Sequence, residues 1–436
     1  MAILFGVILL DLIGFGIVIP ILPFLAPQLG GDKMDVALII VTYAVCAGLC
    51  GPYWGRLSDR LGRKPVIMMC LAGAALSYLM LGQASQLWMV YAARGFAGLM
   101  AGNFGVASAM MADLAPPEKR ARAMGLIGAA FGLGLVLGPL LGGVLSGESA
   151  SLTWPCLVAG VMSVLAVLAA AVFLPESLSP EKRAAHRAQQ KSGQHGSLYS
   201  MLRQTGNRLL VLQYVVHNCC VSCATYLIPL WLGDVLGWHA REVGIVFGVQ
   251  GGLMVILQGG LLGPAVRVLG ELRLLRIAIS VFLLGLLVAV SASTESPMLA
   301  AIFLAMSGAT LCMPLLNSMT SHRTPLAMRG RMLGTTGAAS SWGRVVGPLL
   351  GGANLALFGY AGAWLGCVLI AALYLAWALR TGSPAPLPAA SVAEFLFPRA
   401  VEQAQQFKDS RRAGRGGAEI GYPNFYHVAL GKAEEQ

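Results

Sequence analysis

The chain has 436 residues, of which 57% are hydrophobic and only 11% are charged. This balance excludes a water-soluble enzyme, because a soluble fold needs far more polar surface. The formal net charge of +11 gives no reason to expect a nucleic-acid partner, since the basic residues are concentrated in particular loops that anionic lipid headgroups can neutralise. The composition predicts an all-α membrane protein with several spans, because helices satisfy their own backbone hydrogen bonds in lipid.

Twelve apolar stretches are long enough to cross a bilayer, which takes roughly 20 helical residues. In chain order they are residues 3–24, 36–54, 66–83, 87–112, 123–146, 152–174, 208–232, 241–262, 274–292, 297–319, 331–354 and 360–380. Lys and Arg concentrate in the loops after the even-numbered spans, and such loops face the cytoplasm. We therefore expect a multi-pass protein of the bacterial inner (plasma) membrane with both termini in the cytoplasm. The first span follows Met1 directly and carries no cleavage site, so we expect it to serve as a signal anchor.

A polar segment divides the spans into two sets of six. The string Gly138-Pro139-Leu-Leu-Gly142-Gly143 in the fifth span recurs as Gly347-Pro348-Leu-Leu-Gly351-Gly352 in the fifth span of the second set. This repeat predicts an internal duplication, an architecture that places substrate sites between the repeats near mid-bilayer. The predicted parts are a first half, a cytoplasmic linker, a second half and a cytoplasmic tail, at residues 1–174, 175–207, 208–380 and 381–436.

A cationic loop joins spans two and three and reads Gly-Arg-Leu-Ser-Asp-Arg-Leu-Gly-Arg-Lys-Pro over residues 55–65. Its glycines permit tight turns, and its cations are able to engage Asp59, Asp113 at the end of span four, and lipid headgroups. An ordinary positive loop on the cytoplasmic side is the plainer reading. The string nevertheless resembles the second-to-third-helix loop of the major facilitator superfamily, through Gly55, Asp59, Arg60, Gly62, Arg63 and Lys64.

Further strings extend this resemblance over residues 3–380. The segment that begins at Arg94 and ends at Gly102 resembles the fourth-helix motif of that superfamily. Span five resembles its antiporter motif through Gly128, Gly132, Gly134, Gly138, Pro139, Gly142 and Gly143. The first span, from Leu10 to Pro23, is most similar to that of the 12-helix drug/proton antiporters, notably tetracycline exporters.

The resemblance implies a major facilitator fold of 12 transmembrane helices in two six-helix halves that give access to each side in turn. It also implies a cytoplasmic latch, in which Asp59 faces the amino end of span eleven and Arg63 reaches Asp113 when the cytoplasmic side is closed. The counterpart of this loop in the second half, around Arg267 and Gly270, lacks the Asp. The latch is therefore expected to be one-sided.

Two ionisable residues lie well inside the first half, namely Asp11 in span one and Arg94 in span four. Such residues are costly in lipid and are functional candidates for that reason. Their depths differ by roughly 5–10 Å at 1.5 Å per helical residue, a gap that an arginine side chain can bridge. A pair that moves apart and together would couple transport to proton binding by Asp11, whereas a static pair would only hold the helices together.

The substrate contacts that we expect are Ser77, Asn103, Gln250 and Asn317, although each is equally compatible with a helix–helix hydrogen bond. Tetracycline exporters carry an acid where this chain has Ser77 and a histidine in the neighbourhood of Val255. These departures argue against recognition of a metal-chelated tetracycline.

Cysteines and histidine cluster in span seven as His217, Cys219, Cys220 and Cys223. Because no second ligand cluster accompanies them, we expect no metal site. All nine cysteines fall within spans and are read as small apolar residues, so no disulfide framework is expected.

The sequence as a whole predicts a proton-coupled membrane transporter that exports small amphiphilic compounds or drugs. We expect a monomer that has no cofactor and draws its energy from the proton gradient. It is not expected to be an enzyme, since the chain has no nucleotide-binding loop, no His-Glu-x-x-His string and no nucleophile–base set. Two alternatives remain open, which are a specific transporter of a metabolite, sugar or metal chelate, and a non-transporting scaffold or sensor that uses the tail.

Overall fold

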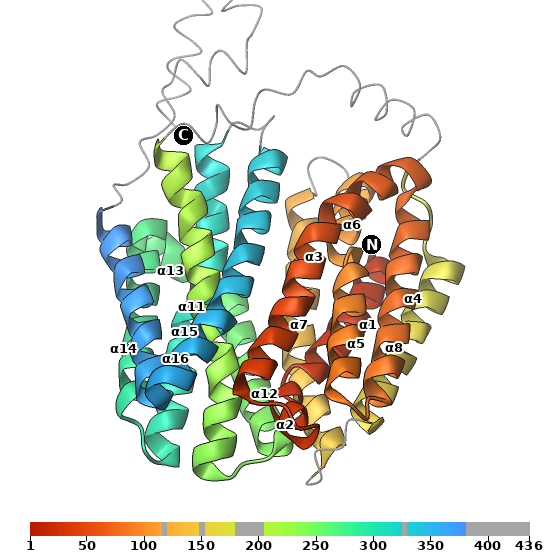
Figure 1. Cartoon of the computed structure of the whole chain (residues 1–436). Helices are drawn as coiled ribbons and strands as arrows, with labels where there is room; N and C mark the ends of the chain where they lie inside the picture. Colours follow the sequence, from red (N-terminus) through yellow and green to blue (C-terminus); the bar gives the residue numbers. More distant parts are fainter. Residues whose placement is uncertain (116–119, 148–152, 179–204, 325–328, 381–436) are drawn as a thin grey trace, which may run out of the picture. The chain divides into compact units, whose positions relative to one another are not determined.

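The computed structural model describes residues 1–115, 120–147, 153–178, 205–324 and 329–380 (Figure 1). Within these residues the secondary structure is helical and contains no strand. The helices are α1 (Ala2–Val18), α2 (Leu22–Gln28), α3 (Lys33–Leu61), α4 (Arg63–Gly82), α5 (Leu87–Leu99), α6 (Asn103–Leu114), α7 (Arg120–Ser146), α8 (Thr153–Phe173), α11 (Thr205–Leu236), α12 (Ala240–Ile256), the π-helix η2 (Leu257–Leu261), α13 (Leu262–Leu269), α14 (Glu271–Ser291), α15 (Glu295–Arg323) and α16 (Arg329–Arg380).

The helices account for the predicted membrane spans. Ten of them in the described part of the chain are long and apolar enough to cross a bilayer, counting α5 with α6 and α12 with α13 as single spans. The pair α1 and α2, bent by 44°, forms an eleventh span. Gly359 has a φ of 66° inside α16 and breaks that helix into two segments. With this break, the described helices correspond to the twelve spans read from the sequence.

The two halves repeat the same turns at corresponding places. Gly30 precedes α3 with a φ of 81°, and Gly237 precedes α12 with a φ of 69°. Gly62 lies between α3 and α4 with a φ of 112°, and Gly270 lies between α13 and α14 with a φ of 76°. Because only glycine adopts these angles without strain, the shared turns support the internal duplication at the level of the backbone.

Residues Met1–Thr381 form one compact unit. In the first half, α7 and α8 pack against α1, and α5 packs between α3 and α4; in the second, α11 packs against α16 and α14 against α15. The most extensive contacts between the halves are those of α7 with α12 and of α3 with α16 (Figure 1), and α2 also contacts α11. The predicted tail, and most of the predicted linker, lie outside the described residues.

Candidate functional site

Asp11 is a buried acid in the middle of α1, with 8% of its surface exposed. Its Oδ2 accepts a hydrogen bond from Asn103 Nδ2, at the start of α6. Ile67 and Leu71 of α4 and Phe104 of α6 line a small cavity beside the carboxylate. The carboxylate therefore lies in apolar surroundings with one amide donor. The free energy of its ionised form depends on whether water reaches it, and without water the protonated form is favoured.

Arg94 of α5 is buried as well, with 5% exposed. Its guanidinium carbon lies 4.4 Å from the centre of the Tyr43 ring, within the range of a cation–π contact. Among the described residues no ion pair joins Arg94 to Asp11, and Arg94 Nε has no hydrogen-bond partner. Tyr43 of α3 lies near both charged groups. In this conformation the predicted pair is thus separated, and Tyr43, which the sequence reading missed, stands near both members.

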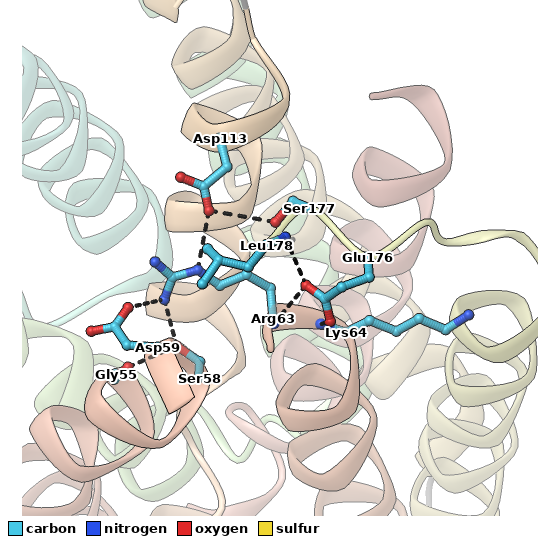
Figure 2. A network of polar contacts seen from close by, with 9 residues as sticks. All are labelled: Gly55, Ser58, Asp59, Arg63, Lys64, Asp113, Glu176, Ser177 and Leu178. Carbon is cyan, nitrogen blue, oxygen red and sulfur yellow. Dashed lines mark hydrogen bonds and ion pairs between the residues drawn. The ribbon is translucent and has the colours of Figure 1, made fainter. Parts of the chain in front are cut away.

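The predicted cytoplasmic latch is a compact polar network around Arg63 (Figure 2). Arg63 Nη1 lies 2.8 Å from Asp59 Oδ1 and donates to Ser58 Oγ at 2.6 Å. Arg63 Nε lies 3.2 Å from Asp113 Oδ2, so the expected contact between these two residues is present. Both partners belong to the first half, and the contact therefore forms without the second half. Residues 325–328, which precede α16, lie outside the described residues, so the contact of Asp59 with the amino end of span eleven stays a prediction.

Glu176, just after α8, is a member of this network that sequence reasoning missed. Its two carboxylate oxygens accept the backbone N–H groups of Arg63 at 3.0 Å and Lys64 at 3.2 Å (Figure 2). These N–H groups are the unpaired donors at the start of α4, where an anion is stabilised. The neighbouring Ser177 donates to Asp113 at 3.4 Å. The signal available in the sequence was an acid two residues after span six, at the start of the polar linker.

The remaining loop residues have structural places. Lys64 Nζ donates to the Ala171 carbonyl at 2.7 Å, which ties α4 to α8. Gly55 accepts a hydrogen bond from Ser58 Oγ at 2.8 Å through its carbonyl. Gly62 is the left-handed residue between α3 and α4. Arg60 lies in the last turn of α3, where a cation interacts favourably with the helix dipole.

The antiporter-motif helix α7 presents two different faces. Gly134, Gly138 and Gly142 contact α1, and a methyl group at Gly138 would lie 2.8 Å from the Ile13 carbonyl oxygen. Gly143 faces the other way, and a methyl group there would lie 2.9 Å from the Gly244 Cα of α12. Gly128 and Gly132 have no neighbour within 4 Å. Pro139 lies inside the helix. Thus α7 connects the helix that carries Asp11 with the second half.

The four expected substrate contacts divide into two groups. Three of them make hydrogen bonds within the protein: Ser77 donates to the Ala74 carbonyl, Asn103 to Asp11, and Asn317 accepts from Tyr214 at 2.8 Å. Gln250 of α12 is 6% exposed, and neither its oxygen nor its nitrogen has a partner among the described residues. Gln250 is therefore the candidate whose side-chain oxygen and nitrogen are available to hydrogen-bond a substrate.

A polar cluster that the sequence reading did not single out joins the halves at the end that holds the α3 amino terminus. Lys33 of the first half forms an ion pair with Asp234 of α11 and lies 5.0 Å from the centre of the Tyr360 ring. Tyr360 donates to Asp234 at 2.6 Å, and Tyr226 donates to the Lys33 carbonyl at 2.7 Å. Charge and hydrogen bonding therefore hold the two halves together at this end.

The cysteines of α11 pack against α16. Cys223 Sγ lies 3.0 Å from Cys367 Sγ, and both thiols are buried in an apolar cluster. In the described part of the chain no group of three or more His, Cys, Asp or Glu is arranged to hold a metal ion.

These observations define a class of protein: a multi-pass helical membrane transporter built from two repeated halves, with buried charges in its spans. Comparison with known sequences names the family, since the model of the major facilitator superfamily matches residues 4–284 and 259–415. The chain belongs to this superfamily, and its relatives place it in a drug-exporter-like branch.

Among those relatives is the class C tetracycline resistance protein of Escherichia coli, 31% identical, with 87% of this chain and 96% of that protein covered. The class G protein of Vibrio anguillarum is 30% identical over 84% of this chain and 93% of its own. The crystal structure of the human organic anion transporter MFSD10 has a TM-score of 0.67 and 24% identity, covering 86% of this chain and 98% of that one. That structure supports the fold.

Proposed function

We propose that this protein exports small amphiphilic compounds in exchange for protons, and that Asp11 carries the proton. The observation that carries the proposal is the buried Asp11 carboxylate, which accepts one amide hydrogen bond from Asn103 and, among the described residues, forms no ion pair with Arg94 in this conformation. A movement that admits water or brings Arg94 nearer changes the free energy of the ionised acid, and this difference between conformations is what proton coupling requires.

Helix α7 supplies the mechanical link in this proposal. Its glycines contact α1 along the residues that follow Asp11, from Leu12 to Ile17, and Gly143 contacts α12 of the other half. Close backbone packing on both faces means that a shift of α1 is transmitted to α12, because packed interiors do not deform continuously. The antiporter motif thus connects the helix of the proton site, α1, with α12, which carries the candidate substrate residue Gln250.

Alternating access is supported by the contacts between the halves at the Lys33 end. We place this end outside the cell and both termini in the cytoplasm, as the distribution of basic loops predicts. The described conformation is then closed to the outside. In the return conformation the Lys33–Asp234 contact opens, and Asp59 meets the amino end of span eleven. The network of Arg63, Asp113 and Glu176 holds the ends of α3, α4 and α6 in place for that meeting.

The direction of transport and the class of compound rest on the relatives. The alignment with this chain covers 96% of the class C and 93% of the class G tetracycline resistance protein. Ser77 stands where those exporters carry an acid, so we expect amphiphiles other than a metal-chelated tetracycline. We expect a monomer in the bacterial inner membrane.

The test is proton release in inside-out vesicles, measured with a ΔpH-sensitive dye on addition of tetracyclines, lipophilic cations, lipophilic anions or neutral amphiphiles. Wild type is expected to release protons with at least one compound class, and Asp11→Asn is expected to release none. Glu295→Gln is the matched control, because Glu295 is an exposed acid outside the membrane core. Equal responses of wild type and Asp11→Asn would refute the proton role of Asp11.

A further inference from the structure

Arg344 is a cation in the middle of span eleven that has no role in the proposed proton site. It lies on α16, fourteen residues after Gly330 in the chain, and its side chain is exposed within a membrane-spanning segment. Its guanidinium donates to Ser341 Oγ at 2.9 Å, one turn earlier on the same helix. An exposed arginine at this depth either faces lipid, which is costly, or faces a polar space inside the protein.

The packing of α3 against α16 decides between these surroundings. A methyl group at Gly48 would lie 3.8 Å from Ser341 Cβ, and one at Gly352 would lie 3.2 Å from Ala37 Cβ. These two contacts define an antiparallel register in which residue numbers fall along α3 as they rise along α16. Arg344 is therefore level with Val45, about 3 Å along the helix axis from Tyr43, and the side chains of Arg344 and Tyr43 are close enough to interact electrostatically. Arg344 faces the first half and not the lipid.

Tyr43 thus lies near two guanidinium groups. Arg94, on α5 of the first half, lies over its ring, and Arg344, on α16 of the second half, lies within electrostatic range of it. The nearby acid, Asp11, is already hydrogen-bonded to Asn103. Among the described residues neither arginine forms an ion pair with a carboxylate, and the Nε of Arg94 has no partner. The interface between the halves therefore carries two unneutralised positive charges at the level of one aromatic ring.

We propose that Tyr43, Arg94 and Arg344 form a substrate site, and that this site takes organic anions with an apolar body. A carboxylate or sulfonate pairs with guanidinium groups through charge-assisted hydrogen bonds, and the Tyr43 ring receives the apolar part. The proposal rests on the proposed transport function and specifies its substrate class. Because the two arginines belong to different halves, a bound anion neutralises both and favours the conformation that brings them together.

The test uses the full chain in proteoliposomes of neutral phosphatidylcholine, with carboxyfluorescein as the anionic probe and ethidium as the cationic one. Wild type is expected to carry carboxyfluorescein with saturable kinetics. Arg344→Gln is expected to raise the KM for carboxyfluorescein at least about tenfold and to leave ethidium unchanged or faster, since a charge-assisted hydrogen bond to the anion is worth about tenfold or more in affinity. Arg344→Lys keeps the charge and is expected to recover part of the affinity. Arg241→Gln removes an exposed cation in the first turn of α12, at the end of a span, and is expected to change neither probe.

Several outcomes would overturn the substrate class. Equal losses for both probes in Arg344→Gln would give Arg344 a structural role, and no loss would remove it from the site. If wild type carries neither probe, binding is measured by quenching of tryptophan fluorescence with carboxyfluorescein, and the absence of saturable quenching refutes the site. Carboxyfluorescein transport that depends on Arg344 but not on a proton gradient would keep the anion site and refute the proton coupling.

Repeating the assay with phosphatidylglycerol added tests a lipid source for the anion. Competition by this lipid, together with no carboxyfluorescein transport, would replace the soluble substrate by a lipid headgroup.

Discussion

The two halves share a backbone plan but differ in the chemistry placed on it. Both begin their second long helix with an acid in the first turn that accepts the backbone N–H of the residue before the helix, Asp35 from Asp32 at 2.8 Å in α3 and Glu242 from His239 at 2.9 Å in α12. Capping and left-handed glycines fix where helices start and turn, and both halves retain them. The side chains at the middle of the spans were free to diverge, and they have done so.

Asp11 and His217 show this divergence most directly. Gly134 of α7 lies against the Ile13 amide, and Gly343, at the same place in the repeated string, lies against the Cys219 amide. Two residues before each amide stand Asp11 and His217. Both are buried, with 8% and 3% exposed, but Asp11 has a hydrogen-bond donor whereas His217 Nδ1 has no partner among the described residues. At equivalent positions of the two repeats, the first half therefore has an acid and the second half a base.

The residue that opens the third span is basic in the first half and acidic in the second. Arg63 opens α4 and pairs with Asp113, while Glu271 opens α14 and lies 3.4 Å from His322 Nε2 near the end of α15. Ser318 also donates to Glu271. The second half thus places Glu271 and His322 in contact at the corresponding place, with acid and base exchanged. The one-sided cytoplasmic latch stays a prediction.

The largest expected effect is the loss of coupling in Asp11→Asn. Asparagine keeps the shape of the side chain but cannot bind a proton at neutral pH, so ΔpH-driven transport is expected to fall to background. His217→Gln is the matched change in the second half and is expected to retain most of the activity, because His217 has no charged partner. Measurement of transport at several pH values in vesicles separates the two. Equal losses in both variants would mean that the halves share the coupling.

The charge networks at the ends of the spans give the next effect. Arg63→Ala leaves Asp59 and Asp113 without their shared cation. Because the Arg63 side chain is only 7% exposed, we expect the free energy of unfolding to fall by about 2 kcal/mol. His322→Ala removes a side chain that is 65% exposed, so we expect less than about 1 kcal/mol. Thermal unfolding in lipid nanodiscs measures both. A larger loss in His322→Ala would reverse the ranking of the halves.

The contact between α7 and α12 is sensitive to added volume. A methyl group at Gly244 would lie 2.7 Å from the Gly143 Cα, so Gly244→Val cannot be accommodated while the helices remain in contact. We expect a shift away from the described conformation by about 1–3 kcal/mol, or roughly 5- to 150-fold in population. Gly252→Val is the control on the same helix, since Gly252 has no neighbour within 4 Å. Hydrogen exchange of the α12 backbone reports the separation, and identical exchange in both variants would contradict the close packing.

The smallest expected effect concerns the Lys33–Asp234 pair. Its side chains are 47% and 42% exposed, and exposed pairs contribute roughly 0.2–1 kcal/mol. Lys33→Asp and Asp234→Lys are each expected to open this end by up to about fivefold, and the double variant to restore wild-type behaviour. Accessibility of the α3 amino terminus to hydrogen exchange is the readout. Additive effects in the double variant would show that the two charges do not interact.

The sequence alone was sufficient for the class of protein, the spans and the duplication. Apolar stretches of bilayer length, basic loops on alternate sides and the repeated Gly-Pro string are local properties, and a bilayer leaves the backbone few alternatives to helix. The contact between Arg63 and Asp113 was also predictable, because the family motif specifies both partners. Asp11 and Arg94 were found for the simpler reason that ionisable residues are rare inside spans.

Only the tertiary structure decided which polar groups meet. Asn103 was expected to contact substrate but lies against Asp11, and Tyr43 lies near charged groups that are far apart in the sequence. Glu176 caps α4 from a distance of more than 100 residues in the chain. The physical reason is that helix rotation and register between neighbouring spans depend on close packing at residues such as Gly138 and Gly143, and no periodicity within one span records which neighbour those residues face.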